Sequence, residues 1–272
     1  MKAAGASVSV EISDIDHDKP QASRSGRWLK SALAAAIDLL FPPRCVACAA
    51  QFESQCGAVL LCQSCDTSLA IDQRPTCPRC AMQCSEIDVP RGNCGDCRSR
   101  KLRFTAARTI GPYRGALRTA VLKGKHALHE PLVKALGQRL AETIRRLPFA
   151  ELPDLVVPVP THWLKQLWRK TNPASTLGEA LSRQLGIPWA GRALICRRFL
   201  QRQASLTPPE RRKNVRGAFY ARNSSRLAGK RILLVDDVMT TGATANEGAR
   251  ALLAAGAAAV YVATVSRSSD DS

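Results

Sequence analysis

Apolar residues near the C-terminus are arranged as two strands separated by a helix. Residues 232–235 form an unbroken apolar run, typical of a parallel strand buried on both faces. Residues 245–255 are rich in helix-forming residues and are followed by Gly256, a natural helix stop. Residues 260–265 then form a second strand-like run. This order predicts a strand–helix–strand unit of a parallel sheet.

Two more patterns precede this unit, and one lies near the N-terminus. Residues 155–160 predict a strand that ends in a Pro-rich turn, and residues 174–185 predict a helix. Apolar residues recur at helical spacing at Trp28, Leu29, Leu33, Ile37 and Leu40. A helix packed on the protein is favoured there over one lying on a membrane surface. We expect a disordered tail at 1–26, an amphipathic helix at 27–44, a cysteine-rich module at 45–100 and an α/β domain at 101–272.

Eight cysteines of the module form two copies of one motif. Each copy has the spacing C-x2-C-x13-C-x2-C, and the second repeats the first with a shift of 32 residues. The two sets are Cys45, Cys48, Cys62, Cys65 and Cys77, Cys80, Cys94, Cys97. Paired C-x-x-C knuckles supply four thiolates to tetrahedral zinc, so the pattern predicts two structural zinc ribbons.

A disulfide framework is the alternative. The polar N-terminus predicts no secretory signal, and a reducing compartment disfavours disulfides. Cys56 and Cys84 fall outside the repeat and are expected to be spare thiols. Cys196 follows an apolar run and is expected to be a small buried residue. No apolar run reaches the roughly 18–20 residues that a membrane-spanning helix needs.

The residues between the two C-terminal runs are suited to a phosphorylated ribose. Asp236 and Asp237 are acceptors for a sugar diol, and the hydroxyl-rich loop at 240–244 lies between a strand and a helix amino end. Backbone N–H groups and the helix dipole favour an anion at that place. A Walker A loop and a dinucleotide fingerprint are excluded, because their lysine and spaced glycines are absent. A solvated turn capped by threonines is the alternative.

The net charge of +18 is unevenly distributed. Residues 1–100 hold 11 basic and 11 acidic side chains, whereas residues 101–272 hold 29 basic and 11 acidic ones. Residues 192–231 contain 12 Lys or Arg against the lone Glu210, which favours polyanion contact over a merely solvated face. The scarcity of aromatic residues there weakens a stacking platform. The candidate contacts are Arg197, Arg198, Arg211, Arg212, Lys213 and Arg216.

Residues 232–244 closely resemble the phosphoribosyl-diphosphate signature of type I phosphoribosyltransferases. That resemblance implies that Asp236 and Asp237 bind the ribose hydroxyls of phosphoribosyl diphosphate (PRPP), and that Mg²⁺ arrives with the diphosphate. The 5′-phosphate would be cradled by Thr240, Thr241, Gly242, Ala243 and Thr244. In such a sheet, Val159 and Pro160 would lie in the loop that meets the diphosphate. Lys123 and Lys125 lie in a Gly-containing segment that could close over diphosphate, and a basic surface explains them equally well.

Over residues 35–267 the chain resembles the ComF family, in which a zinc-ribbon module precedes a phosphoribosyltransferase-like domain. The matching blocks are residues 38–45, 112–115 with 122–123, 156–160, 214–219 and the phosphate loop. The expected fold is therefore α/β, a type I phosphoribosyltransferase with a mostly parallel sheet behind a small double zinc ribbon. The chain departs at 169–173, which reads Arg-Lys-Thr-Asn-Pro where the family usually has Arg-Gly-Phe-Asn-Gln.

The family resemblance implies a role in DNA uptake during natural transformation. The protein would bind PRPP or a related ribose 5-phosphate, and single-stranded DNA, in the cytoplasm or peripherally at the inner membrane. The charge-balanced ribbons would dock a partner such as a DNA-uptake helicase or processing protein. The alternative is an active phosphoribosyltransferase of nucleotide or nucleoside metabolism that releases diphosphate from PRPP. No residue outside the ribose site indicates a general base, so the sequence leaves catalysis open.

Overall fold

The computed structural model describes residues 42–52, 60–87, 89, 92, 94–98, 100–161, 172–200, 207–222 and 224–268. The predicted tail at 1–26, nearly all of the predicted helix at 27–44, Cys56 and residues 162–171 lie outside the described residues. Contacts divide the chain into Met1–Pro43 and Arg44–Ser272, and all described helices and strands belong to the second unit. Among the described helices, none combines the length and the apolar character needed to cross a membrane.

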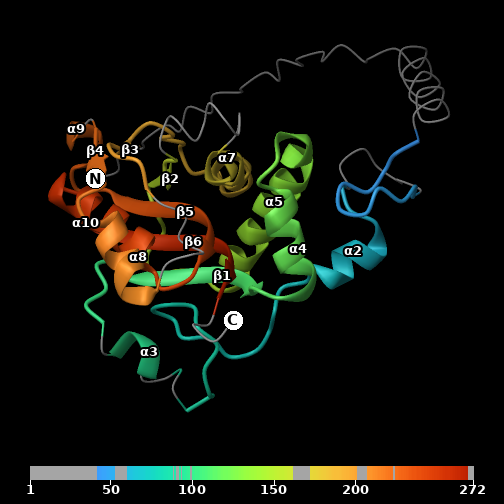
Figure 1. The fold of residues 1–272 in the computed structure, drawn as a ribbon, viewed down its shortest axis with the longest axis horizontal. Helices are drawn as coiled ribbons and strands as arrows, with labels where there is room; N and C mark the ends of the chain where they lie inside the picture. The colour runs from blue at the N-terminus through green and yellow to red at the C-terminus, as the bar shows by residue number, and fades with distance from the viewer. Residues whose placement is uncertain are drawn as a thin grey trace, which may run out of the picture. The chain divides into compact units, whose positions relative to one another are not determined.

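A four-stranded parallel sheet forms the centre of the second unit (Figure 1). Its strands, in spatial order, are β1 (Ala106–Pro112), β6 (Ala259–Arg267), β5 (Arg231–Met239) and β2 (Leu155–Pro158). The strands predicted at 155–160, 232–235 and 260–265 are confirmed. β5 continues through the acid pair because its backbone stays paired with β6 as far as Met239 and Arg267. The acid pair therefore lies at the carboxyl edge of the sheet.

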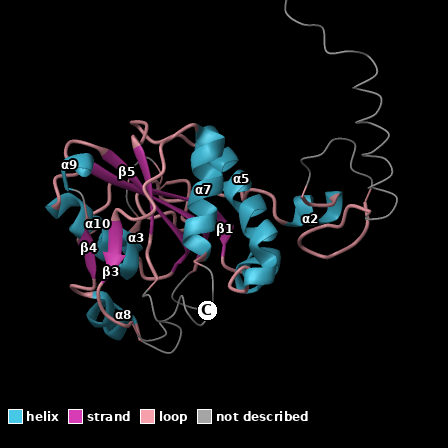
Figure 2. Ribbon diagram, turned by 90° about the horizontal axis from the view of Figure 1, so that it is seen from above, coloured by secondary structure: helices cyan, strands magenta, loops and turns pink. Residues whose placement is uncertain are grey.

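Helices cover both faces of this sheet (Figures 1 and 2). α5 (Glu130–Arg146) and α7 (Pro173–Leu185) lie on one face, and α10 (Ala243–Ala254) lies on the other. Alternate residues of β5 enter different cores: Leu233 and Val235 face α5 and α7, whereas Ile232 and Leu234 face α10. The helices predicted at 174–185 and 245–255 are confirmed as α7 and α10.

A small antiparallel sheet packs beside α10 (Figure 2). It consists of β3 (Leu194–Cys196) and β4 (Phe219–Ala221), with α8 (Pro208–Val215) before β4 and α9 (Ser224–Leu227) after it. Within β4, the side chains of Phe219 and Ala221 are buried, whereas Tyr220 points outward and is 46% exposed. Cys196 is buried, as predicted.

The cysteine-rich module is a structural repeat as well as a sequence repeat. An isolated antiparallel bridge joins Arg44 to Gln51 in the first ribbon, and the equivalent bridge, 32 residues later, joins Thr76 to Gln83. The alanine two residues before the end of each bridge has a positive φ, 63° in the first ribbon and 56° in the second. The remaining helices are α2 (Gln63–Ser68), α3 (Gly95–Arg98), α4 (Gly115–Lys123) and the 3₁₀ turn η1 (Ala127–His129).

Candidate zinc centres and ribose-phosphate site

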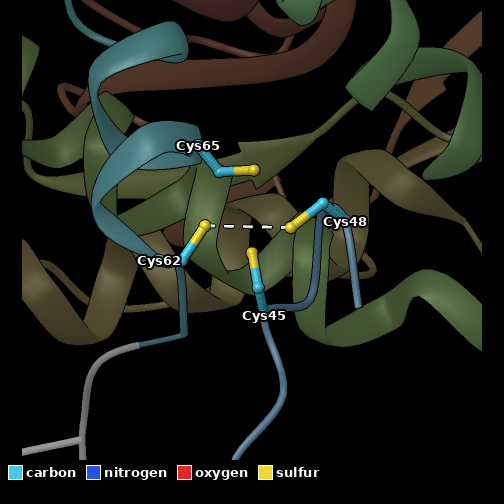
Figure 3. A group of neighbouring side chains, drawn as sticks. All are labelled: Cys45, Cys48, Cys62 and Cys65. Atoms are coloured by element: carbon cyan, nitrogen blue, oxygen red, sulfur yellow. Dashed lines mark hydrogen bonds between the residues drawn. The ribbon is translucent and has the colours of Figure 1, made fainter. Parts of the chain in front are cut away.

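Four thiols converge in the first ribbon (Figure 3). Cys45 and Cys48 come from the loop at the start of the ribbon, and Cys62 and Cys65 come from the beginning of α2. All four sulfurs lie within 4.8 Å of one another, and the Sγ atoms of Cys48 and Cys62 are 3.7 Å apart. With Zn–S distances of about 2.3 Å, a tetrahedral site has an edge of about 3.8 Å. The first group therefore fits zinc.

The second ribbon brings together Cys77, Cys80, Cys94 and Cys97, and all four are buried. Its Sγ–Sγ distances are 3.7 Å between Cys77 and Cys97 and 3.5 Å between Cys80 and Cys94. A hydrogen bond from the Cys80 thiol lowers the pKa of Cys77 to about 4 against the opposing effect of burial, and backbone N–H groups lower it further. The hydrogen bond with Cys77 and burial raise the pKa of the Cys80 thiol, and burial raises the pKa of Cys97 to about 11, so Cys77 is the ligand held as a thiolate by the protein itself. The second group also fits zinc.

The segment between β5 and α10 surrounds a small hollow at the carboxyl edge of the sheet. Its lining includes the predicted residues Asp236, Thr240, Gly242, Ala243 and Thr244, together with Thr264 from β6. Gly242 has a φ of 73°, a left-handed conformation that glycine adopts without strain, and it is the N-cap of α10. The first turn of a helix leaves N–H groups that an anion satisfies. The structure thus brings the loop residues together where phosphate binding is predicted.

Thr241, Asp236 and Asp237 differ in their burial and hydrogen bonds around this hollow. Thr241 is buried, and its hydroxyl accepts a hydrogen bond from the Ala243 N–H at 3.3 Å. Asp236 lines the hollow, whereas the Asp237 carboxylate accepts from the adjacent Val238 N–H at 2.8 Å. Burial raises the pKa of Asp236 well above its usual range, and the charge of Asp237 raises it further. What these acids bind stays a prediction.

A buried arginine that the sequence interpretation did not identify holds the loop from behind. Arg267, the last residue of β6, is 5% exposed. Its Nη1 donates to the carbonyls of Met239, at 3.1 Å, and of Thr240, and its Nε donates to the Cys80 carbonyl of the second ribbon at 3.1 Å. In a trans peptide the C=O and N–H groups point in opposite directions. Fixing these carbonyls therefore turns the N–H groups of the same peptides toward the other side of the loop.

Residues just after the second ribbon support the same loop. Arg100 donates from Nη1 to the Thr241 carbonyl at 3.0 Å, and the Arg103 N–H donates to Asn246 in the first turn of α10. The sequence signal for Arg267 is a charge at the end of an otherwise uncharged strand. Arg100 stands in no predicted helix or strand, so no comparable signal marks its contact, which joins residues 141 positions apart.

Val159 and Pro160 follow β2 at the carboxyl edge, as the family resemblance implies. The Val159 N–H donates to the Val235 carbonyl at 2.8 Å. The Asn172 amide donates to the Val159 carbonyl at 3.2 Å, and its side-chain oxygen accepts from the Ala174 N–H at 3.2 Å as the N-cap of α7. Asn172 belongs to the family pattern at 169–173, so this retained residue joins the loop after β2 to the next helix.

Lys123 and Lys125 lie in different surroundings. Lys123, the last residue of α4, donates from Nζ to the Ala47 carbonyl of the first ribbon at 2.7 Å. Lys125 lies near enough to the acid pair for its charge to oppose the rise in the pKa of Asp236. The structure therefore directs Lys123 to the ribbon and brings Lys125 within electrostatic reach of the hollow.

The six candidate polyanion contacts lie around the small sheet and α8. Arg198 donates to three carbonyls at the end of α8, those of Lys213 (3.3 Å), Asn214 (2.9 Å) and Arg216 (2.7 Å). It therefore caps that helix. The guanidinium of Arg197 lies 3.8 Å from the centroid of the Tyr220 ring. Arg211 is half-buried, and the remaining three candidates are exposed: Arg212, Lys213 and Arg216.

The lone acidic residue of the basic segment, Glu210, caps the start of α8. Glu210 accepts from both the N–H and the hydroxyl of Thr207 at 2.8 Å, which completes a capping box at the start of α8. These hydrogen bonds lower the pKa of Glu210. The carboxylate therefore stabilises the helix terminus and stays ionised there.

Comparison with known proteins assigns the family. A double zinc ribbon domain matches residues 36–100, and a phosphoribosyl transferase domain matches residues 171–271. Competence protein F of Haemophilus influenzae is 29% identical over 206 residues, which are 74% of this chain and 88% of that protein. The DNA utilization protein YhgH of Escherichia coli (strain K12) is 31% identical over 206 residues with the same coverage. The chain belongs to the ComF family.

The ComF architecture predicted from the sequence is confirmed. A double zinc ribbon precedes a type I phosphoribosyltransferase domain with a parallel sheet, and the two four-cysteine groups are zinc-binding sites. Among solved structures, a glutamine phosphoribosylpyrophosphate amidotransferase from B. subtilis is 26% identical with a TM-score of 0.34. That match covers 48% of the ComF-family chain and 25% of the amidotransferase.

Proposed function

We propose that this ComF-family protein binds PRPP or a related ribose 5-phosphate group, and single-stranded DNA, during DNA uptake in natural transformation. The observation that carries the proposal is the loop after β5, which presents the amino end of α10 while Arg267 holds its carbonyls on the opposite side. The names of the relatives, DNA utilization protein and competence protein F, support the biological role.

Within the hollow, each group would have a separate task. Asp236 and Asp237 would accept hydrogen bonds from the ribose hydroxyls, and residues 240–244 would bind the 5′-phosphate through N–H and hydroxyl donors. Val159 and Pro160 would border the diphosphate. Mg²⁺ would arrive with the diphosphate, whose charge it neutralises.

The other parts of the chain would connect this site to DNA handling. Arg197, Arg212, Lys213 and Arg216 would attract the phosphate backbone of a single strand. The zinc ribbons would dock a DNA-uptake helicase or processing protein. The protein would act in the cytoplasm, either free or peripherally at the inner membrane.

The site is tested by the double substitution Asp236→Asn with Asp237→Asn. We expect the rise in melting temperature produced by PRPP and Mg²⁺ to disappear, because neutral amides lose the charge-assisted bonds to the ribose hydroxyls. Glu130→Gln with Glu179→Gln is the matched control, since it neutralises two half-buried carboxylates of α5 and α7 that pair with Lys134 and Arg183. A wild-type shift in the Asp236/Asp237 variant would show that the hollow is not the ribose site.

An active transferase is the second candidate function, and the match to the phosphoribosyl transferase domain favours it. Phosphoribosyl transfer depends on positioning and on stabilising the departing diphosphate. Diphosphate release from PRPP, measured with each nucleobase and with a DNA oligonucleotide, separates turnover from binding. If diphosphate is released by the wild type but not by the Asp236/Asp237 variant, the protein is an active transferase. If PRPP raises the melting temperature but no diphosphate is released, the protein binds PRPP without turning it over.

A further inference from the structure

An open groove of about 570 Å³ lies beside β2, near its amino end. The segment after α7 forms one wall by pairing with β2. The Val156 N–H donates to the Pro188 carbonyl at 2.9 Å, and the Ala190 N–H donates to the Val156 carbonyl at 2.9 Å. Leu155 and Leu227 also line the groove. It is distinct from the ribose-phosphate hollow, which borders the carboxyl ends of β5 and β6.

The charged lining of this groove is entirely basic. Arg192, Arg222 and Arg226 line it and are exposed, and no acidic side chain is among the lining residues described. Asp154, next to β2, forms a two-point ion pair with Arg231, at 2.9 and 3.1 Å. Within the described part of the chain, the three guanidinium groups therefore keep their charge free for an external anion.

An aromatic wall completes the groove. The Trp189 indole packs between two glycines: a Cβ on Gly178 of α7 would lie 2.5 Å from its Cζ3, and a Cβ on Gly191 would lie 2.8 Å from its Nε1. Any larger residue at these two positions would displace the ring. Trp189 is therefore held in one place, and the basic side chains surround a preformed surface.

The outer face of the small sheet continues this surface. Tyr220 and Arg222 are two residues apart along β4 and its end, so strand alternation places them on the same face. The Tyr220 ring is 46% exposed and carries the Arg197 guanidinium at 3.8 Å from its centroid. An aromatic ring stacked with a guanidinium is a surface on which an unpaired base stacks.

The far end of this face leads toward the ribose-phosphate hollow. Gly217, between α8 and β4, donates from its N–H to Glu247 of α10 at 2.7 Å. Glu247 lies near the amino end of the same helix whose first turn borders the hollow. Arg212 and Lys213 are exposed on α8, which packs against the same helix α10.

We propose that the groove and the outer face of β3 and β4 form a track for single-stranded nucleic acid. Arg192, Arg222 and Arg226 bind its phosphates, and the Arg197–Tyr220 stack receives a base. This inference rests on the proposed binding of a single strand, and it assigns a location to that binding. The groove residues add three basic contacts to those predicted from the sequence.

The surface favours a single strand over a duplex for a physical reason. A duplex keeps its bases stacked and paired, so it offers phosphates to the arginines but no free base face to Tyr220. Phosphate contacts alone make binding dependent on salt and indifferent to strandedness. Dependence on Tyr220 is thus the property that distinguishes the track from a general polyanion surface.

The first test reverses the groove charge with Arg222→Glu and Arg226→Glu. A fluorescein-labelled 20-nucleotide oligothymidine is titrated with the full-length zinc-loaded protein, and binding is followed by fluorescence anisotropy at several salt concentrations. We expect affinity to fall roughly tenfold or more, and the salt slope to decrease by about 1.4, since each lost single-strand contact contributes about 0.7. Arg118→Glu with Arg146→Glu is the control, because it makes the same charge change on exposed positions of α4 and α5. The milder Arg222→Gln with Arg226→Gln guards against misfolding, and an intact PRPP-induced thermal shift verifies the fold.

The second test is Tyr220→Ala, with Tyr220→Phe as its matched control. We expect the alanine variant to lose about tenfold in single-strand affinity, and the phenylalanine variant to bind as the wild type does. If the wild type binds no oligothymidine, both the proposed single-strand binding and the track are wrong. If it binds and the groove variants weaken it no more than the control, the location alone is overturned. Equal affinity for a duplex, with no effect of Tyr220→Ala, would overturn the single-strand assignment.

Discussion

The two zinc ribbons share a fold and a ligand set, yet they are embedded differently. In the first ribbon Cys48 is exposed and Cys62 and Cys65 are half-buried, whereas the four cysteines of the second are between 1% and 4% exposed. The first ribbon contacts the helical side of the domain, through Lys123 with Ala47 and through Arg139 with Asp66. The second contacts the loop after β5 through Arg267.

This difference separates the geometry that the sequence repeat determines from the contacts that depend on the surroundings of each ribbon. The knuckle geometry is the same at a shift of 32 residues, because it is determined by the four thiolates and the tight turn around them. The contacts outside the knuckles are not repeated. We therefore expect the second ribbon to support ligand binding, and the first to remain available for a protein partner.

The largest expected effect comes from removing the metal of each ribbon in turn. Cys77→Ser with Cys80→Ser should lose one of the two zinc ions and also the PRPP-induced thermal shift, because the Cys80 carbonyl no longer holds Arg267 in place. Structural zinc binding contributes about 10–16 kcal/mol to the folding of small zinc domains, so the local fold of that ribbon should be lost. Zinc content by colorimetric titration and melting curves with PRPP measure both effects.

The matched variant is Cys45→Ser with Cys48→Ser in the first ribbon. It should also lose one zinc ion but keep the PRPP-induced shift, since no described hydrogen bond joins the first ribbon to residues 239–244. Equal loss of PRPP binding in both variants would show that the ribbons do not differ in this respect.

A smaller effect is expected from Arg267 itself, with both zinc sites intact. Arg267→Met removes the donors to the carbonyls of Met239, Thr240 and Cys80 and should lower the free energy of unfolding by about 3 kcal/mol. Urea denaturation measures that loss, and PRPP titration should show weaker binding at unchanged zinc content. Arg267→Lys keeps the positive charge but lacks the planar guanidinium. Its unfolding free energy and its PRPP affinity should lie between those of the wild type and those of Arg267→Met. An unchanged unfolding midpoint in Arg267→Met would mean that the arginine does not brace the loop.

Features that depend on residues close together in the sequence were predictable, whereas contacts between distant residues were not. The cysteine spacing and the apolar run at 232–235 are local patterns, so the zinc ligands and the position of the loop at 240–244 were predictable. The contacts of Arg267 with Cys80 and of Arg100 with Thr241 join positions 187 and 141 residues apart. No local pattern encodes such pairs, because they depend on how the ribbon packs against the sheet.

Lys123 shows the same limit on the first ribbon's side. Its position in a Gly-containing segment suggested either a loop over diphosphate or a basic surface, but the amino group of a helix-terminal lysine can turn to either side of the chain. The structure directs it to the Ala47 carbonyl, whereas Lys125 influences Asp236. Two lysines separated by a single residue are therefore assigned to different regions of the molecule.

The smallest expected effect is that of Lys123→Met, which keeps the apolar stem and removes the donor to Ala47. The free energy of unfolding should fall by about 1 kcal/mol, and a chelator should remove the first zinc faster, while the PRPP-induced thermal shift is retained. Lys125→Met should leave zinc release unchanged, because it does not touch the ribbon. It should reduce the PRPP-induced thermal shift, because it removes a positive charge near Asp236. Zinc release to a chromogenic chelator and PRPP titration measure the two properties on the same samples. If Lys123→Met abolished the PRPP shift and left zinc release unchanged, Lys123 would belong to the diphosphate site, and the first ribbon would lose its clearest contact with the domain.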